Sequence, residues 1–169
     1  VEGGTMNFSG RLLTSNAVTY NQSGGTVNVT TVGNSLSSSA GFDLSSTSAS
    51  FTMSGGTIVL VQASSGGTPY DYQVLATSPN ITGGTLQVGK STTATNFNFR
   101  ISGAIPNLVI DNTTNNKTAT LFADASVYLD TTINSGATIN LNGFFLTERG
   151  TTFTNNGTLA GTATTTRLY

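Results

Sequence analysis

One short motif recurs in this chain and limits its possible folds more than any other feature. Gly-Gly-Thr is followed by an apolar, a variable and an apolar residue in four copies, which begin at Gly3, Gly24, Gly55 and Gly83. The first interval between copies is the shortest, and the next two are longer. Such repetition is typical of stacked structural units, each of which buries its apolar face against the next unit. We expect a unit of about 21 residues, with loop insertions near 35–50 and 64–72 in the longer intervals.

The residues that follow the motif predict β-strands. Apolar and polar residues alternate in Val27-Asn28-Val29, Leu86-Gln87-Val88 and Ile139-Asn140-Leu141, which places the apolar side chains on one face. The chain contains 32 Thr, 19 Ser and 17 Asn, so residues that favour strands or interrupt helices dominate it. No window shows an apolar stripe at helical spacing. The sequence therefore predicts an all-β fold whose core contains the apolar alternates.

A weaker repeat in the C-terminal half has similar spacing. The segments TNNKTATL (114–121), INSGATINL (133–141) and TNNGTLAG (154–161) align on Lys117, Gly136 and Gly157. Together the repeats favour one domain over residues 1–169, a single-stranded right-handed parallel β-helix (β-solenoid) of about eight coils, each of about 19–21 residues. The alternative is an antiparallel β-sandwich, whose turns come about every 8–12 residues and need no tripeptide at a fixed spacing.

The repeats also resemble those of a known class of protein. Stretches such as QSGGTVNV, ITGGTLQV, IPNLVIDN (105–112) and FTNNGTLAG (153–161) are similar to repetitive segments of large bacterial surface proteins. These are adhesins and autotransporter-passenger-like proteins that form right-handed parallel β-helices. The resemblance implies a section of a longer, exported protein that serves as a stalk or adhesive rod at the cell surface. It carries no catalytic motif, so no catalytic residue follows from it.

Composition excludes several classes of function. Six Lys and Arg residues face seven Asp and Glu residues, so the chain lacks the basic surplus that nucleic-acid binding requires. The absence of Cys and His removes disulfides, thiolate metal sites and histidine acid–base chemistry. No apolar stretch is long enough to span a bilayer, so we expect no membrane insertion of this segment. Low charge with abundant Thr, Ser and Asn favours an extracellular, non-enzymatic protein.

Charged residues follow several expected strands at intervals close to one coil. They are Lys90, Asp111, Asp130 and the pair Glu148-Arg149. If residues one period apart stack, Asp111 and Asp130 lie about 5 Å apart on neighbouring coils. The favoured interpretation is that these charges occupy solvated corners. Two alternatives are a Ca²⁺ site, since carboxylate oxygens suit hard cations, and the acid and base of a glycosidase or lyase.

The second candidate site is Tyr70-Asp71-Tyr72, in the Gly- and Pro-rich segment that we expect to be a loop insertion. Aromatic side chains on a protruding loop can stack on a sugar ring or anchor a partner surface, so a glycan or a host or neighbouring cell is the expected partner. The alternative is that one tyrosine covers the wall of the solenoid. Exposed terminal coils would also favour edge-to-edge self-association. No cofactor other than Ca²⁺ is expected.

Overall fold

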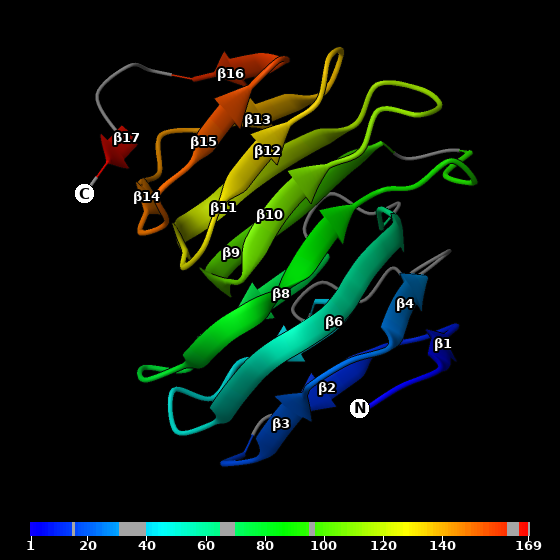
Figure 1. Ribbon diagram of the computed structural model, residues 1–169, viewed down its shortest axis with the longest axis vertical. Coiled ribbons are helices and arrows are strands. Elements are labelled where there is room, and N and C mark those ends of the chain that lie inside the picture. The colour runs from blue at the N-terminus through cyan, green and yellow to red at the C-terminus, as the bar shows by residue number, and fades with distance from the viewer. Residues whose placement is uncertain (15, 31–39, 65–69, 95–96, 162–165, 169) are drawn as a thin grey trace.

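The chain forms two β-sheets, seen in a computed structural model that describes residues 1–14, 16–30, 40–64, 70–94, 97–161 and 166–168 (Figure 1). The described residues contain no helix, and hence none that could cross a membrane. Every described pair of strands runs parallel. The all-β prediction is confirmed, and the antiparallel sandwich is wrong for the described strands.

We call the two sheets sheet A and sheet B. Sheet A contains β1 (Thr5–Phe8), β3 (Thr19–Gln22), β4 (Thr26–Thr30), β6 (Ser50–Gln62), β8 (Asn80–Val88), β10 (Asn107–Ile110), β12 (Thr131–Ile133) and β15 (Phe153–Asn155). Sheet B contains β2 (Leu12–Thr14), β5 (Phe42–Leu44), β7 (Tyr72–Val74), β9 (Asn98–Ile105), β11 (Thr118–Val127), β13 (Thr138–Asn140), β14 (Leu146–Glu148), β16 (Thr158–Ala160) and β17 (Thr166–Leu168).

The chain passes back and forth between the sheets and adds strands to each in sequence order. The main path through sheet A is β1-β4-β6-β8-β10-β12-β15, and the main path through sheet B is β2-β5-β7-β9-β11-β13-β16. The N-terminal strands β1 and β2 and the C-terminal strands β15 and β16 lie at opposite ends of this stack (Figure 1). Each path has seven described strands, fewer than the eight coils expected, because partners in the N-terminal half are separated by more chain than one expected coil. Thr57, for example, lies opposite Thr26, and the chain between them is about half as long again as the expected repeat unit.

The Gly-Gly-Thr copies stack on one another, as the repeat predicts. Thr5 pairs with Thr26, Thr26 with Thr57 and Thr57 with Thr85. The second glycine of each copy has a positive φ, which disfavours residues with a Cβ. At Gly56 an added Cβ would also collide with the carbonyl oxygen of Gly24 in the preceding copy. Conformation and close stacking together require glycine at this bend.

The weaker C-terminal repeat stacks one residue differently from its sequence alignment. Thr118 pairs with Thr138, and Thr138 with Thr158, so Lys117 is level with Ala137 rather than Gly136. The turns before β11 and β13 differ in length, with residues 111–117 before β11 and residues 134–137 before β13, and the alignment on Gly136 is one residue off. Of the predicted insertions near 35–50 and 64–72, residues 35–39 and 65–69 lie outside the described part of the chain. Within the rest of the predicted insertions, Phe42–Leu44 and Tyr72 belong to strands rather than loops.

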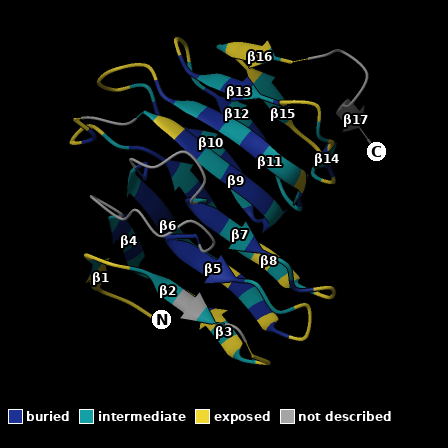
Figure 2. Ribbon diagram, turned by 180° about the vertical axis from the view of Figure 1, so that it is seen from behind, coloured by how far each residue is buried: buried dark blue, intermediate teal, exposed yellow. Residues whose placement is uncertain are grey.

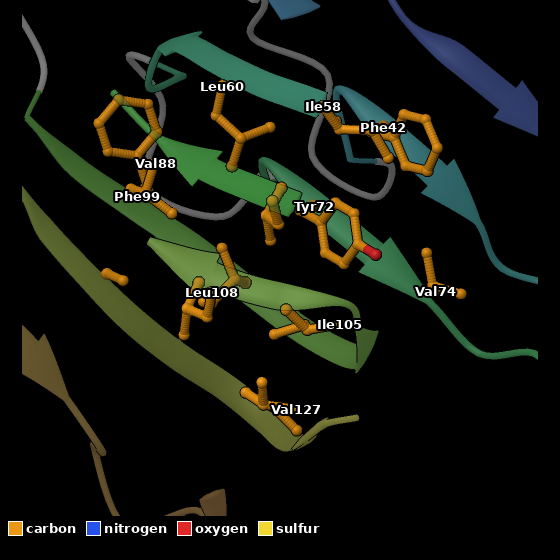
Figure 3. Close-up of a cluster of buried hydrophobic side chains, with 14 of the residues drawn as sticks. Phe42, Ile58, Leu60, Tyr72, Val74, Val88, Phe99, Ile105, Leu108 and Val127 are labelled. Carbon is orange, nitrogen blue, oxygen red and sulfur yellow. The ribbon is translucent and has the colours of Figure 1, made fainter. Parts of the chain in front are cut away.

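The core lies between the two sheets (Figures 2 and 3). It includes Ile58, Leu60, Val88 and Leu108 from sheet A and Phe42, Tyr72, Val74, Phe99, Ile105 and Val127 from sheet B. The alternates expected inside, namely Val27, Val29, Leu86, Val88, Ile139 and Leu141, are all buried. Leu159, also expected inside, is 37% exposed. The strand pattern thus predicts most of the core, but not this position on β16.

Candidate functional site

Of the three residues at 70–72, Tyr72 belongs to the core. It begins β7, is fully buried, and its ring stacks on Phe42 with centroids 5.4 Å apart. Its hydroxyl donates a hydrogen bond to the carbonyl oxygen of Ala104 at 2.7 Å, which satisfies the polar group in the interior. Tyr72 is therefore a packing residue and cannot contact a ligand from a loop.

Asp71 is also buried, with 1% of its surface exposed. Its two carboxylate oxygens accept hydrogen bonds from the backbone N–H of Ser64 at 2.7 Å and of Arg100 at 2.8 Å. Burial raises the pKa of Asp71, and these bonds oppose that rise. The Arg100 guanidinium binds the backbone carbonyl and hydroxyl oxygens of Ser64. Asp71 thus fastens residue 64 to the outside of sheet B, and both of its oxygens are engaged within the protein.

Tyr70 alone of the three is partly accessible. It is half-buried, and its ring lies parallel to that of Phe122 on β11, with centroids 3.3 Å apart. One ring face is thereby covered. The expected three-residue binding loop is not formed, because two of its members are buried and the third packs on its own protein.

Asp111 and Asp130 lie at opposite ends of neighbouring strands. Ile110 pairs with Ile133, so Asp111 follows the end of β10. Asp130 precedes β12 and is level with Asn107, whose side-chain oxygen accepts the Asp130 N–H at 3.0 Å. Asp111 is four residues after Asn107 along the chain, so the levels of Asp130 and Asp111 are about 13 Å apart along the strand direction. The expected stacking at about 5 Å is wrong, because the two residues belong to different corners of the chain path.

Each of these aspartates has its own partners. Asp111 accepts hydrogen bonds from the backbone N–H and hydroxyl of Thr113, and its Oδ2 lies 3.7 Å from Nζ of the fully buried Lys117. Asp130 Oδ1 accepts the backbone N–H groups of Thr151 and Thr152. The described residues contain no group of three or more Asp or Glu side chains that could hold a metal ion. The two carboxylates therefore do not share a Ca²⁺ site.

The structure instead brings Asp130 near Glu148, which the sequence grouped with Arg149 as a strand-exit charge. Glu148 is 3% exposed and projects toward sheet A, where the buried Thr131 hydroxyl donates to its carboxylate. The N–H of Gly150 also donates to it, at 3.2 Å. Burial raises the pKa of Glu148, and the negative charge of Asp130 raises it further. This carboxyl group is enclosed, so it is a structural element of the corner.

An open groove of about 520 Å³ lies on the outer face of sheet B, across β7, β9, β11 and β14. Its floor follows one row of the sheet, in which Ala104 pairs with Ser126 and Ser126 with Thr147. Asp124 and Phe145 lie on one side of this row, two residues before Ser126 and Thr147, and Tyr128 lies on the other side. We call these six residues the outer groove (the strands are seen in Figure 2).

The sides of the outer groove are fixed by local contacts. Asp124 Oδ1 accepts the backbone N–H of Phe145 at 3.0 Å, which ties the two residues together across β11 and the start of β14. The Arg149 guanidinium lies over the Tyr128 ring, 4.9 Å from its centroid. Phe145 is 36% exposed, a large fraction for an aromatic side chain. The outer groove thus combines a small polar floor, two aromatic rings and one carboxylate.

Sequence reasoning missed the outer groove. Tyr128 and Phe145 occur in VYLD and GFFL, where they read as ordinary members of apolar strands. Their outward direction follows from the burial of Val127 and Leu146 beside them, through the alternation of a strand. The pairing of two small residues, Ala104 and Ser126, marks the floor of the outer groove, but this pairing is known only from the register of the strands.

Comparison with known proteins does not identify a family for this chain. No protein-family model, no curated protein and no solved structure matches it. The geometry of its own residues therefore carries the functional argument.

Proposed function

We propose that the chain is a right-handed parallel β-helix and a section of a bacterial cell-surface protein, in which it acts as a non-catalytic structural and adhesive rod. The observation that carries this proposal is the parallel, in-register stacking of seven strands in each of two sheets. Six strand spacings correspond to about 29 Å of rod. The alternation of the chain between the sheets supports a helical path, and the strong preference of parallel crossovers supports its right hand.

The stack gives the rod a continuous interior. One inward column of sheet A runs through Met6, Val27, Ile58, Leu86 and Leu108. Each strand buries its apolar side chains against those of its neighbours, so stability grows with the number of levels rather than with any enclosed globular core. Such a structure holds its two ends apart, which is the mechanical requirement of a stalk.

A non-catalytic role also agrees with the placement of the carboxylates. The carboxylate-pair mechanism requires two accessible groups within about 10 Å of each other. Asp111 and Asp130 are separated by the length of a strand, and Glu148, the carboxylate near Asp130, is buried. The alternative of a carbohydrate-active enzyme therefore lacks its candidate residues.

Limited proteolysis of intact producing cells tests the surface location. Peptides from this segment should appear in the released fraction together with those of known surface proteins, and not with cytoplasmic markers. Recovery of the segment only after lysis contradicts the proposal.

Incubation of the purified chain with a panel of polysaccharides tests the non-catalytic role, because new reducing ends or unsaturated products would contradict it.

A further inference from the structure

We propose that the outer groove binds a neutral, linear oligosaccharide. This inference rests on the proposed adhesive function and supplies its ligand class. It uses the six residues of the outer groove together with Arg149, which lies over Tyr128. Four observations carry it: the small floor, the aromatic sides, the fixed carboxylate and the balance of charge.

The floor is long, narrow and shallow. Ala104, Ser126 and Thr147 lie side by side on three adjacent strands. Leu75, the residue after β7, extends the row, because Val74 pairs with Gly103. Four strands at about 4.8 Å spacing give a row of roughly 14 Å that runs along the stack, across the strands. An extended chain of several sugar units fits this shape better than a single ring does. The hydroxyls of Ser126 and Thr147 are suited to hydrogen bonds with sugar hydroxyls.

The sides supply apolar contact. Phe145 lies two residues before the floor row and Tyr128 two residues after it. The backbone positions of the two residues are therefore about 13 Å apart along the strand direction, and their side chains occupy part of that width. Aromatic rings offer large, rigid surfaces at a small cost in conformational entropy. The C–H-rich face of a pyranose packs on such a ring, while its hydroxyls remain directed toward polar groups. A purely apolar ligand would leave the hydroxyls of Ser126 and Thr147 without partners.

The carboxylate of Asp124 adds direction. Its Oδ1 accepts the Phe145 N–H, which fixes the orientation of the group. An oriented carboxylate accepts hydrogen bonds from sugar hydroxyls, and such charge-assisted bonds are stronger than neutral ones. Asp124 is exposed, so its side chain is accessible from solvent.

Charge favours a neutral ligand. Asp124 lies on one side of the floor, while Arg149 lies over Tyr128 on the other. The two opposite charges leave no net attraction for a polyanion or a polycation. A uronic-acid polymer would bring its carboxylates toward Asp124, and this repulsion disfavours it.

The experiment uses a glycan array that includes neutral and uronic-acid oligosaccharides, followed by titration calorimetry with the strongest neutral ligand. Phe145→Ala should weaken that affinity by about tenfold or more, through loss of the ring contact. Ser126→Leu should do the same by filling the floor. Leu159→Ala is the matched control, because Leu159 is 37% exposed but lies on β16, outside the outer groove. It should leave the affinity unchanged.

Ligand-induced amide shifts in the wild-type chain keep the test independent of variant folding. They should concentrate at Ala104, Ser126, Asp124 and Phe145. Absence of binding to every neutral glycan, preference for uronic-acid glycans, or shifts elsewhere on the molecule would overturn the inference. Proteolysis of intact cells tests the surface location independently of glycan binding. Failure of the glycan experiment would therefore contradict the proposed ligand without contradicting the proposed surface rod.

Discussion

At the scale of single residues, the molecule encloses several of its few charges. Asp43, Asp71, Asp111, Lys117 and Glu148 are all buried. Buried charges are tolerated where hydrogen bonds replace water. Backbone N–H groups and hydroxyls donate such bonds to Asp71, Asp111 and Glu148, and Lys117 donates to a backbone carbonyl oxygen. The sequence predicted Asp111 and Glu148 as strand-exit charges, yet the favoured interpretation put both in solvent, whereas both are buried. Composition cannot distinguish a solvated corner from one that a neighbouring segment covers.

The buried carboxyl groups predict an unusual pH dependence. Burial raises the pKa values of Asp43, Asp71 and Glu148 above those of the same groups in the unfolded chain. A raised pKa means that the folded state binds the proton more tightly, so this stabilisation is complete below the unfolded pKa and is lost as the pH rises through the folded value. The free energy of unfolding, measured by urea denaturation, should therefore fall as the pH increases from about 4.

Glu148→Gln tests the contribution of one of these groups. The amide retains an acceptor and can exchange hydrogen bonds with the Thr131 hydroxyl, so the corner should remain folded. Because glutamine does not titrate, the variant should lose less stability than the wild type between about pH 4 and neutral pH. An identical or steeper decline would contradict the assignment of a raised pKa to Glu148.

Two variants of Lys117 distinguish the contribution of its packing to stability from the contribution of its charge. Its side chain is fully buried, its Nζ donates to the carbonyl oxygen of Thr114, and its stem lies so close to Gly89 that an added Cβ there would approach Cγ to 2.7 Å. Lys117→Ala should cost about 3 kcal/mol in urea denaturation, through a cavity and a lost ion pair. Lys117→Met keeps most of the stem and should cost about 1 kcal/mol. Equal losses would show that the charge dominates.

At the scale of strands, the sequence predicts register where a conformationally demanding motif marks it. The Gly-Gly-Thr copies specify a positive φ and a close approach, and all four stack as expected. The strand-exit charges did not stack, because one circuit contains corners of more than one kind. Asp111 follows a strand of sheet A, whereas Asp130 precedes one. The repeat period predicts how many residues separate one coil from the next, but it does not predict at which turn of the coil a given residue lies.

The bends provide a matched pair of glycine variants. Gly4 and Gly56 both have a positive φ, at 74° and 80°. A Cβ at Gly4 meets nothing within 4 Å, whereas one at Gly56 collides with the Gly24 carbonyl oxygen. Gly4→Ala should therefore cost only the conformational penalty, about 1–2 kcal/mol. Gly56→Ala should cost at least about 2 kcal/mol more in thermal or urea unfolding, because backbone must move. Similar losses would contradict the stacked bend.

At the scale of the whole molecule, the outer groove shows what the sequence could not predict. Its six residues lie on or next to β9, β11 and β14, between Ala104 and Thr147, and no local pattern links them. They meet only because parallel pairing brings Ala104, Ser126 and Thr147 into one row. The core needs only alternation within each strand, and alternation is visible in sequence. A groove on the outside depends on the relative sizes of side chains that face out from neighbouring strands, which requires the register.

The stack also predicts how stability is distributed along the molecule. Interior strands such as β8 and β9 have a partner on each side, whereas β1 and β16 pair on one side only among the described strands. Apolar side chains at these ends are the most exposed, with Met6 at 43% and Leu159 at 37%. In a structure held together by nearest-neighbour contacts, local opening begins where one neighbour is missing and moves inward.

Amide hydrogen exchange should therefore give the greatest protection in β6, β8, β9 and β11 and a graded decline toward both ends. Uniform protection from β1 to β16 would require all-or-none opening and would contradict the nearest-neighbour account. A single protection minimum in the middle would contradict the continuous stack itself.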